Sequence, residues 1–226
     1  MIEFLNNLLK AKNNTFIGKS NFQKFISNNE IRQLLESFNS YSNEAEIRFV
    51  GGCVRKLIVD EEVDDIDLST NLKPQDIIEV LKKNNINFHE TGIKHGTITA
   101  VINKKIFEIT SLRKDIKTDG RHAQVEYTND WLEDASRRDF TINAIYLDKH
   151  GNLFDPFNGK KDLINGSINF IGDPTKRIKE DYLRILRYIR FFLGYSSIQH
   201  DKKTVKIIKQ NLSGLKKISK DRQLQE

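Results

Sequence analysis

The sequence predicts an α+β fold in which a mixed β-sheet flanked by helices is followed by an all-helical region. Three observations predict it. Apolar residues recur at helical spacing near the N-terminus, short β-prone segments alternate with helical ones through the middle, and beyond about residue 175 only helical patterns occur. We therefore divide the chain into an N-terminal helical segment (1–45), a sheet domain (46–172) and a helical domain (173–226).

The first elements are a helical stretch and a short strand. Residues 1–40 are predicted to be helical, because their second half places apolar side chains three and four positions apart. Residues 47–50 (Ile-Arg-Phe-Val) are β-prone, and Gly51-Gly52 ends them with a turn. A helix can start within residues 54–59.

A second strand, a helix and a hairpin follow. Residues 65–69 are predicted to be a strand. Residues 74–83 are predicted to be a helix that begins on proline, whose missing N–H costs little in a first turn. Residues 96–102 and 105–112 form a predicted hairpin.

The remaining elements are assigned from polarity and turn residues. The polar, charged segment 113–130 is predicted to be a loop, and residues 131–139 to be a helix. Residues 142–147 and a turn at 149–152 indicate a further hairpin. From about residue 175 onward the sequence predicts helix after helix.

Composition indicates a globular protein in a reducing compartment. The 226 residues are 38% hydrophobic and 30% charged, and no run approaches the roughly 18 apolar residues of a membrane helix. The N-terminus is too polar for a signal peptide, and Cys53 is the single cysteine. We therefore expect a cytoplasmic protein without a membrane partner, and the sequence leaves its oligomeric state open.

Charge is unevenly distributed along the chain. Residues 176–226 carry 14 Lys and Arg against 5 Asp and Glu, whereas residues 1–175 carry 23 against 26. The net charges are therefore +9 and −3. A basic C-terminal part suggests a polyanionic partner, and a solvated lysine-rich helix face is the alternative.

The first motif is Gly51-Gly52 followed by Asp65-x-Asp67. Successive strand side chains alternate between faces, so the two carboxylates share one face and repel unless a cation lies between them. Mg²⁺ suits such a pair because it prefers hard oxygen ligands, including substrate phosphates. The glycines let the backbone approach a triphosphate, and Arg55 could contact its oxygens. Taken alone, an exposed acidic pair and a simple turn explain the same residues.

The second motif is residues 137–144 (Arg-Arg-Asp-Phe-Thr-Ile-Asn-Ala). Asp139 could accept a hydrogen bond from a ribose 2′-OH, and the two arginines could bind phosphate. The alternative is an arginine-rich helix C-terminus that the helix dipole stabilises.

The third motif is residues 180–187 (Glu-Asp-Tyr-Leu-Arg-Ile-Leu-Arg). On a helix, Asp181 and Arg184 are neighbours three residues apart, and a plain salt bridge is one interpretation. The other is base recognition, since a carboxylate accepts hydrogen bonds and a guanidinium donates them. Cytosine and adenine both present an amine donor beside a ring-nitrogen acceptor, so this pair would accept C and A and reject G and U.

In this order the motifs resemble those of the class II tRNA nucleotidyltransferase (CCA-adding) and bacterial poly(A) polymerase family, and they are closer to the CCA-adding members. Segments similar to its first four motifs are 49–55 with Asp65 and Asp67, 137–144, 155–159 and 180–187. A looser match to the fifth is 219–222 with Glu226. The resemblance covers residues 45–226 and implies a nucleotidyltransferase head domain followed by a helical neck domain.

The resemblance also implies residue roles. Asp65 and Asp67 would be the catalytic metal ligands for two Mg²⁺ ions, and Glu108 an auxiliary catalytic carboxylate. Asp139 would select ribose, and Asp181 with Arg184 would template the base. The implied nucleotide-binding residues are Gly51, Gly52, Arg55, Arg138, Asp139, Asn143, Asp181, Arg184 and Arg187.

The implied function is an enzyme of tRNA processing that adds C, C and A to the tRNA 3′ end from CTP and ATP, with release of pyrophosphate. A poly(A) polymerase and a non-catalytic RNA-binding remnant are the alternatives. Segment 113–125 resembles the flexible loop with which these enzymes switch from C to A. Lys56 departs from the family, which usually has an acidic residue there, and we expect catalysis to survive it. We also expect this chain to lack the C-terminal body and tail that grip tRNA in the family.

Overall fold

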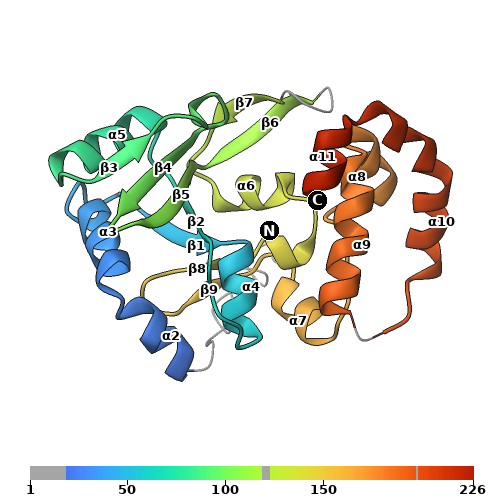
Figure 1. The fold of residues 1–226 in the computed structure, drawn as a ribbon, viewed down its shortest axis with the longest axis horizontal. Helices are drawn as coiled ribbons and strands as arrows, with labels where there is room; N and C mark the ends of the chain where they lie inside the picture. The colour runs from blue at the N-terminus through green and yellow to red at the C-terminus, as the bar shows by residue number, and fades with distance from the viewer. Residues whose placement is uncertain (1–18, 119–122, 197) are drawn as a thin grey trace, which may run out of the picture.

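The computed structural model describes residues 19–118, 123–196 and 198–226, and it contains one seven-stranded mixed sheet (Figure 1). The strand order is β3-β4-β5-β2-β1-β8-β9. Its strands are β1 (Ile47–Val50), β2 (Ile66–Thr70), β3 (Asn87–His89), β4 (Thr97–Ile102), β5 (Lys105–Ser111), β8 (Tyr146–Leu147) and β9 (Leu153–Phe154). Only β2 and β5 pair in parallel within this sheet, and the other neighbours are antiparallel.

Helices pack around this sheet, and after β9 the described elements up to the C-terminus are all helical (Figure 1). They are α2 (Lys19–Ile26), α3 (Asn29–Asn39), α4 (Gly52–Ile58), α5 (Pro74–Lys83), α6 (Trp131–Arg137), α7 (Gly159–Ile164), α8 (Pro174–Glu180), α9 (Leu183–Tyr195), α10 (Lys202–Asn211) and α11 (Lys220–Gln225). Short 3₁₀ turns are η1 (Ile93–His95), η2 (Thr141–Asn143) and η3 (Leu212–Lys217). No helix in the described ranges is long and apolar enough to cross a membrane.

The main core lies between the sheet and helices α3, α4 and α5. Helix α3 buries Leu34 and Phe38 on one face, and the side chain of Asn28 caps its first turn by accepting from two backbone N–H groups. This apolar stripe is the spacing that predicted a helix there. The core fixes the sheet against which the candidate site is built.

A second apolar cluster joins the sheet domain to the C-terminal helices. Phe140 and Phe170 pack with Tyr188 and Phe191 of α9, and Ile208 of α10 completes the cluster. Burial of large aromatic side chains is the main energetic contribution of such a cluster. The division at 172/173 stays a prediction, and this shared core crosses it.

Most predicted elements are confirmed. The strands at 47–50 and 66–70, the helix at 74–83, the hairpin of β4 with β5 and the C-terminal helices all form. The described part of 1–40 forms two helices, α2 and α3, because Asn28 caps α3 and interrupts the stretch. Residues 1–18 lie outside the described residues. Strand β3 and helix α7 were not predicted, because both are short.

Two predictions are wrong. Segment 113–130 is not only a loop, since β6 (Arg113–Thr118) and β7 (Ala123–Tyr127) pair as an antiparallel ribbon, with residues 119–122 outside the described residues. Its cross-strand contacts include the ion pair Lys114–Glu126 at 3.2 Å, so polarity does not mark it as irregular. Within 142–147 only Tyr146–Leu147 is strand, because the residues before it form the turn η2.

Residues 155–159 (Asp-Pro-Phe-Asn-Gly) have a structural explanation. The Asp155 carboxylate accepts from the backbone N–H groups of Gly159 and Lys160, which begin α7. A Cβ atom on Gly159 would overlap the backbone carbonyl of Thr141. A glycine here therefore lets α7 pack directly on η2, which carries Asn143.

We expect Gly159→Ala to lower the free energy of unfolding by about 2 kcal/mol, because the added methyl meets rigid backbone. Gly194→Ala is the matched control, since that glycine lies in α9 and a methyl added there would have nothing within 4 Å. The control should be neutral or stabilising by up to about 1 kcal/mol. Urea unfolding of both variants measures the difference, and equal stabilities would contradict the close approach of α7.

Candidate active site

Three carboxylates lie together where β2 and β5 pair. Asp67 on β2 is directly opposite Glu108 on β5, and Asp65 immediately precedes β2. Burial, followed by the negative charges of Glu108 and Asp65, raises the pKa of Asp67 to about 6. Such repulsion is relieved by a proton or by a cation.

The glycine turn lies against this group. Gly51 ends β1 with a φ of +72°, a conformation that side chains disfavour. A Cβ atom at this position would lie 3.6 Å from Oδ2 of Asp67. A group bound at the turn would therefore also be beside the carboxylates.

The donor set fits a hard divalent cation bound partly by its substrate. Across the described ranges no group of three or more His, Cys, Asp or Glu residues is already arranged around a metal position. Mg²⁺ is commonly held by one or two carboxylates, with phosphate oxygens and water completing the octahedron. Asp65 and Asp67, next to a turn suited to phosphate, match that requirement.

A buried polar chain connects the glycine turn to helix α9. Arg55 of α4 donates to Oδ1 of Asn143, and Nδ2 of Asn143 donates to Asp139 at 2.7 Å. Nε of Arg187 donates to Oδ2 of Asp139 at 2.6 Å, and Arg187 also pairs with Glu226. Burial alone would raise the pKa of Asp139, but Arg187 and the hydrogen bonds hold it below its usual range. Four predicted nucleotide-binding residues are thus brought into one network.

Arg55 retains an unused donor inside this network. Its guanidinium packs 4.8 Å from the Phe191 ring centre, and its Nε is buried without a hydrogen-bond partner in the part of the chain that the structure describes. A buried unsatisfied donor is costly. The Nη2 of the same guanidinium lies on the side of the glycine turn, 3.9 Å from a Cβ atom built on Gly52.

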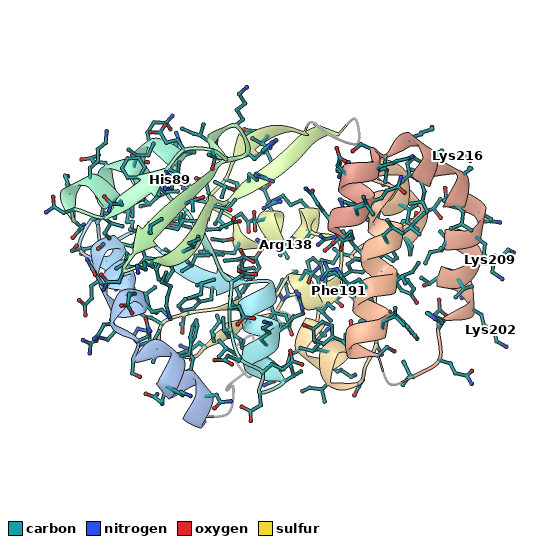
Figure 2. The ribbon with its side chains drawn as sticks, in the orientation of Figure 1. His89, Arg138, Phe191, Lys202, Lys209 and Lys216 are labelled. Carbon is teal, nitrogen blue, oxygen red and sulfur yellow. The ribbon has the colours of Figure 1, made fainter. Side chains whose placement is uncertain are left out.

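Arg138 has an internal role that the sequence did not reveal. It is centrally placed (Figure 2) and donates to Asp134, to the Tyr146 hydroxyl at 2.9 Å and to Ser69 at 3.1 Å. Burial would raise the pKa of Asp134, but Arg138 and Arg137 hold it well below its usual range. The cluster connects α6 to β2 and β8. The i,i+4 spacing of Asp134 and Arg138 was the one signal in the sequence that could have indicated this contact.

Asp181 and Arg184 do not form the salt bridge that was one interpretation of their spacing. Asp181 lies in the break between α8 and α9, where its carboxylate accepts from Arg222 at 2.9 Å and from the backbone N–H of Leu183. Arg184 pairs instead with Glu180 at 2.7 Å. The break removes the geometry of a continuous helix, so the two side chains have separate partners at the start of α9.

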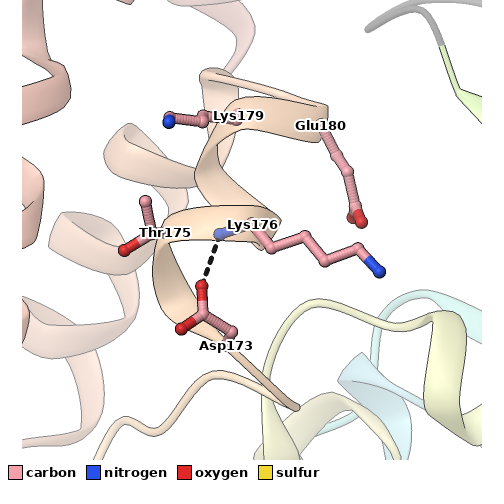
Figure 3. A pocket seen from close by; sticks show the side chains of 5 residues that line it. All are labelled: Asp173, Thr175, Lys176, Lys179 and Glu180. Atoms are coloured by element: carbon pink, nitrogen blue, oxygen red, sulfur yellow. Dashed lines mark hydrogen bonds between the residues drawn. The ribbon is translucent and has the colours of Figure 1, made fainter.

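A hollow of about 450 Å³ lies on α8, beside this segment (Figure 3). Its lining residues are Asp173, Thr175, Lys176, Lys179 and Glu180. The Asp173 carboxylate in it accepts from the backbone N–H of Lys176 and so caps α8. None of the predicted site residues lines this hollow.

Lys56 is neutralised locally. Its Nζ lies 2.6 Å from Oδ2 of Asp64, the residue before Asp65. The pair connects α4 to the start of β2 at the surface, where such a bridge contributes at most about 1 kcal/mol. The departure at Lys56 therefore places no uncompensated charge beside the carboxylates.

The mixed sheet with these carboxylates and the helices that follow it is the fold of a nucleotidyltransferase head domain with its adjoining helical region. The family model described as the Poly A polymerase head domain matches residues 47–169. The chain belongs to this family.

Named relatives agree with this assignment. CCA tRNA nucleotidyltransferase 1, mitochondrial, is 45% identical over 195 residues in Homo sapiens, covering 85% of this chain and 44% of the relative. The protein of that name in Danio rerio is 43% identical over 183 residues, covering 80% and 42%. This chain thus spans less than half the length of these curated relatives.

Solved structures share the fold. The Bacillus stearothermophilus CCA-adding enzyme in complex with CTP superposes with a TM-score of 0.75 and 30% identity, over 91% of this chain and 47% of that one. A tRNA nucleotidyltransferase complexed with a primer tRNA and an incoming ATP analog gives a TM-score of 0.67 and 28% identity, over 83% and 53%.

We expect Asp134→Asn to destabilise the protein by about 3 kcal/mol near neutral pH, because it leaves Arg138 buried without its anion. The folded pKa of Asp134 lies below its ordinary value of 3.8, so its ionised form stabilises the fold above that pH. This stabilisation is lost as the pH falls, and the two proteins should converge in acid. Denaturant unfolding at neutral and acid pH measures the gap.

Asp130→Asn is the control on the same helix, because Asp130 is exposed and asparagine caps a helix equally well. It should change stability by less than about 0.5 kcal/mol. A pH-independent loss in Asp134→Asn would contradict the electrostatic explanation.

Proposed function

We propose that this protein adds C, C and A to the 3′ end of tRNA from CTP and ATP, releasing pyrophosphate. The observation that carries the proposal is the convergence of Asp65, Asp67 and Glu108 beside the Gly51 turn, in a chain of this family. The names of the relatives in two vertebrates support tRNA as the acceptor.

Asp65 and Asp67 hold the proposed Mg²⁺ ions, and Glu108 adds negative charge beside them. When bound, the metals supply charge stabilisation for an in-line displacement at the α-phosphate. The turn at Gly51-Gly52 and Nη2 of Arg55, which lies 3.9 Å from a Cβ atom built on Gly52, bind phosphate oxygens. The chain's residues thus orient the triphosphate towards the RNA 3′-OH.

Asp139 and the residues at the start of α9 recognise the ribose and the base of the nucleotide. Asp139 keeps acceptor capacity at Oδ2, whose one hydrogen-bond partner among the described residues is Arg187, and this oxygen can accept from the ribose 2′-OH. Arg184 uses only Nη1 for its hydrogen bonds within the described ranges, so Nε and Nη2 can donate to a base. The Asp181 carboxylate accepts from the amine that C and A share.

Poly(A) addition is the second candidate, because the matching family model describes a poly(A) polymerase head. The proposed location is the cytoplasm, although both relatives above carry a mitochondrial designation. The RNA-binding remnant remains an alternative to either enzyme.

The deciding experiment supplies tRNA lacking its CCA end, Mg²⁺, and each labelled triphosphate alone and together. We expect C, C and then A to be incorporated, and expect Asp65→Asn to reduce turnover by at least about a thousandfold while binding RNA normally. Long A tails without a CTP requirement would favour the polymerase. Binding without incorporation would favour the remnant, and Mg²⁺ omission is the matched control.

Base selection is tested by Arg184→Ala. Loss of a charged hydrogen bond of about 1.5–3 kcal/mol should reduce discrimination against UTP and GTP by about 10- to 100-fold. Arg190→Ala is the control, because Arg190 is on the same helix but pairs with Glu226. Ratios of kcat/KM for the four triphosphates give the readout, and unchanged ratios in Arg184→Ala would refute base reading by this residue.

A further inference from the structure

The excess positive charge of the protein is confined to one segment. Residues 198–220 contain seven lysines and one aspartate, a net charge of +6. The whole chain has 37 basic and 31 acidic residues, so everything outside this segment holds 30 of each. The segment comprises α10, η3 and the residues around them, and it therefore carries the net charge of the entire molecule.

The lysines of α10 form a stripe on its outer face. Thr204 and Ile208 are buried on the inner side, where α10 packs against α8. Lys202, Lys206 and Lys209 are exposed at positions i, i+4 and i+7, which share one helix face. Figure 2 shows Lys202, Lys209 and Lys216 along the outer edge of the helical region, extending away from the protein.

These lysines have no anionic partner in the ranges that the structure describes, whereas Arg187, Arg190 and Arg222 in the same region are all paired with carboxylates. The one acidic residue within the segment, Asp201, is engaged with Thr204 as the cap of α10. Like charges four residues apart destabilise a helix by a few tenths of a kcal/mol. Stability of α10 therefore gives no reason for the stripe, and an anionic partner does.

A shallow depression of about 430 Å³ follows the stripe. Its lining residues are Lys202, Val205, Lys206, Lys209 and Gln210. From Lys202 to Lys209 the helix rises about 10 Å, which matches roughly three nucleotides of one strand of a duplex. A membrane surface fits less well, because the apolar face of α10 that would enter lipid is buried inside the protein.

We propose that Lys202, Lys206 and Lys209, extended by Lys216, form a contact surface for the phosphate backbone of the RNA substrate at a distance from its reacting 3′ end. The proposal rests on the proposed function, since it assumes an RNA acceptor. Helix α9 stands between α10 and the sheet domain (Figure 1), so these lysines add affinity without touching the nucleotide. Phosphate contacts of this kind are independent of sequence.

The test is the triple variant Lys202→Gln, Lys206→Gln and Lys209→Gln in the full chain. Its binding to tRNA lacking the CCA end is measured by fluorescence anisotropy over a series of KCl concentrations. Loss of three phosphate contacts should lower the slope of log Kd against log salt by about 2–3 and raise Kd at least about tenfold at low salt. We expect kcat at saturating RNA to be unchanged.

The matched control removes the same charge from the sheet domain by Lys82→Gln, Lys94→Gln and Lys149→Gln, three exposed lysines. The control should keep the wild-type slope, which separates a local contact from net charge. An unaltered slope in the α10 variant would overturn the proposal. The proposal would also be overturned if the α10 variant kept the wild-type salt dependence of RNA binding but lost binding to phosphatidylserine vesicles. That result would indicate a membrane contact. If the wild-type chain neither binds nor extends RNA, the proposed function itself fails first.

Discussion

The contact between Asp139 and Arg187 is the interaction on which the candidate site depends. Asp139 follows α6 in the sheet domain, Arg187 belongs to α9, and through Asn143 the same carboxylate is linked to Arg55 beside the glycine turn. Removing one member of a buried charged pair leaves the other unpaired, so the network fixes the geometry of both regions together. The aromatic cluster of Phe140 and Phe191 surrounds it with apolar surface and strengthens its electrostatics.

The carboxylates at β2 and β5, unlike the paired charges of Asp139 and Arg187, are like charges placed next to each other. The parallel register places Asp67 against Glu108, and burial with that neighbouring charge disfavours ionisation of Asp67. The backbone hydrogen bonds of the sheet keep the groups close despite their repulsion. This repulsion lowers the stability of the folded protein at a place where a cation can bind, which is common at functional sites.

Charge is thus arranged in three zones across the molecule. Carboxylates gather at the central strands β2 and β5, paired charges fill the boundary between the two regions, and lysines without an anionic partner in the described ranges line α10. In the proposed function, the triphosphate and its metals occupy the first zone, the ribose and base occupy the second, and the RNA backbone occupies the third.

The sequence by itself determined the elements with strong local signals and the chemical types at the site. Gly51-Gly52 and Pro74 predicted boundaries correctly and the apolar spacing of α3 predicted a helix there, because turns, capping and helical periodicity are local properties. Only the tertiary structure decided which charges meet. Arg222 pairs with Asp181 across 41 positions, and Arg187 with Asp139 across 48. No spacing rule reaches that far, since such partners are set by how the helices pack against the sheet.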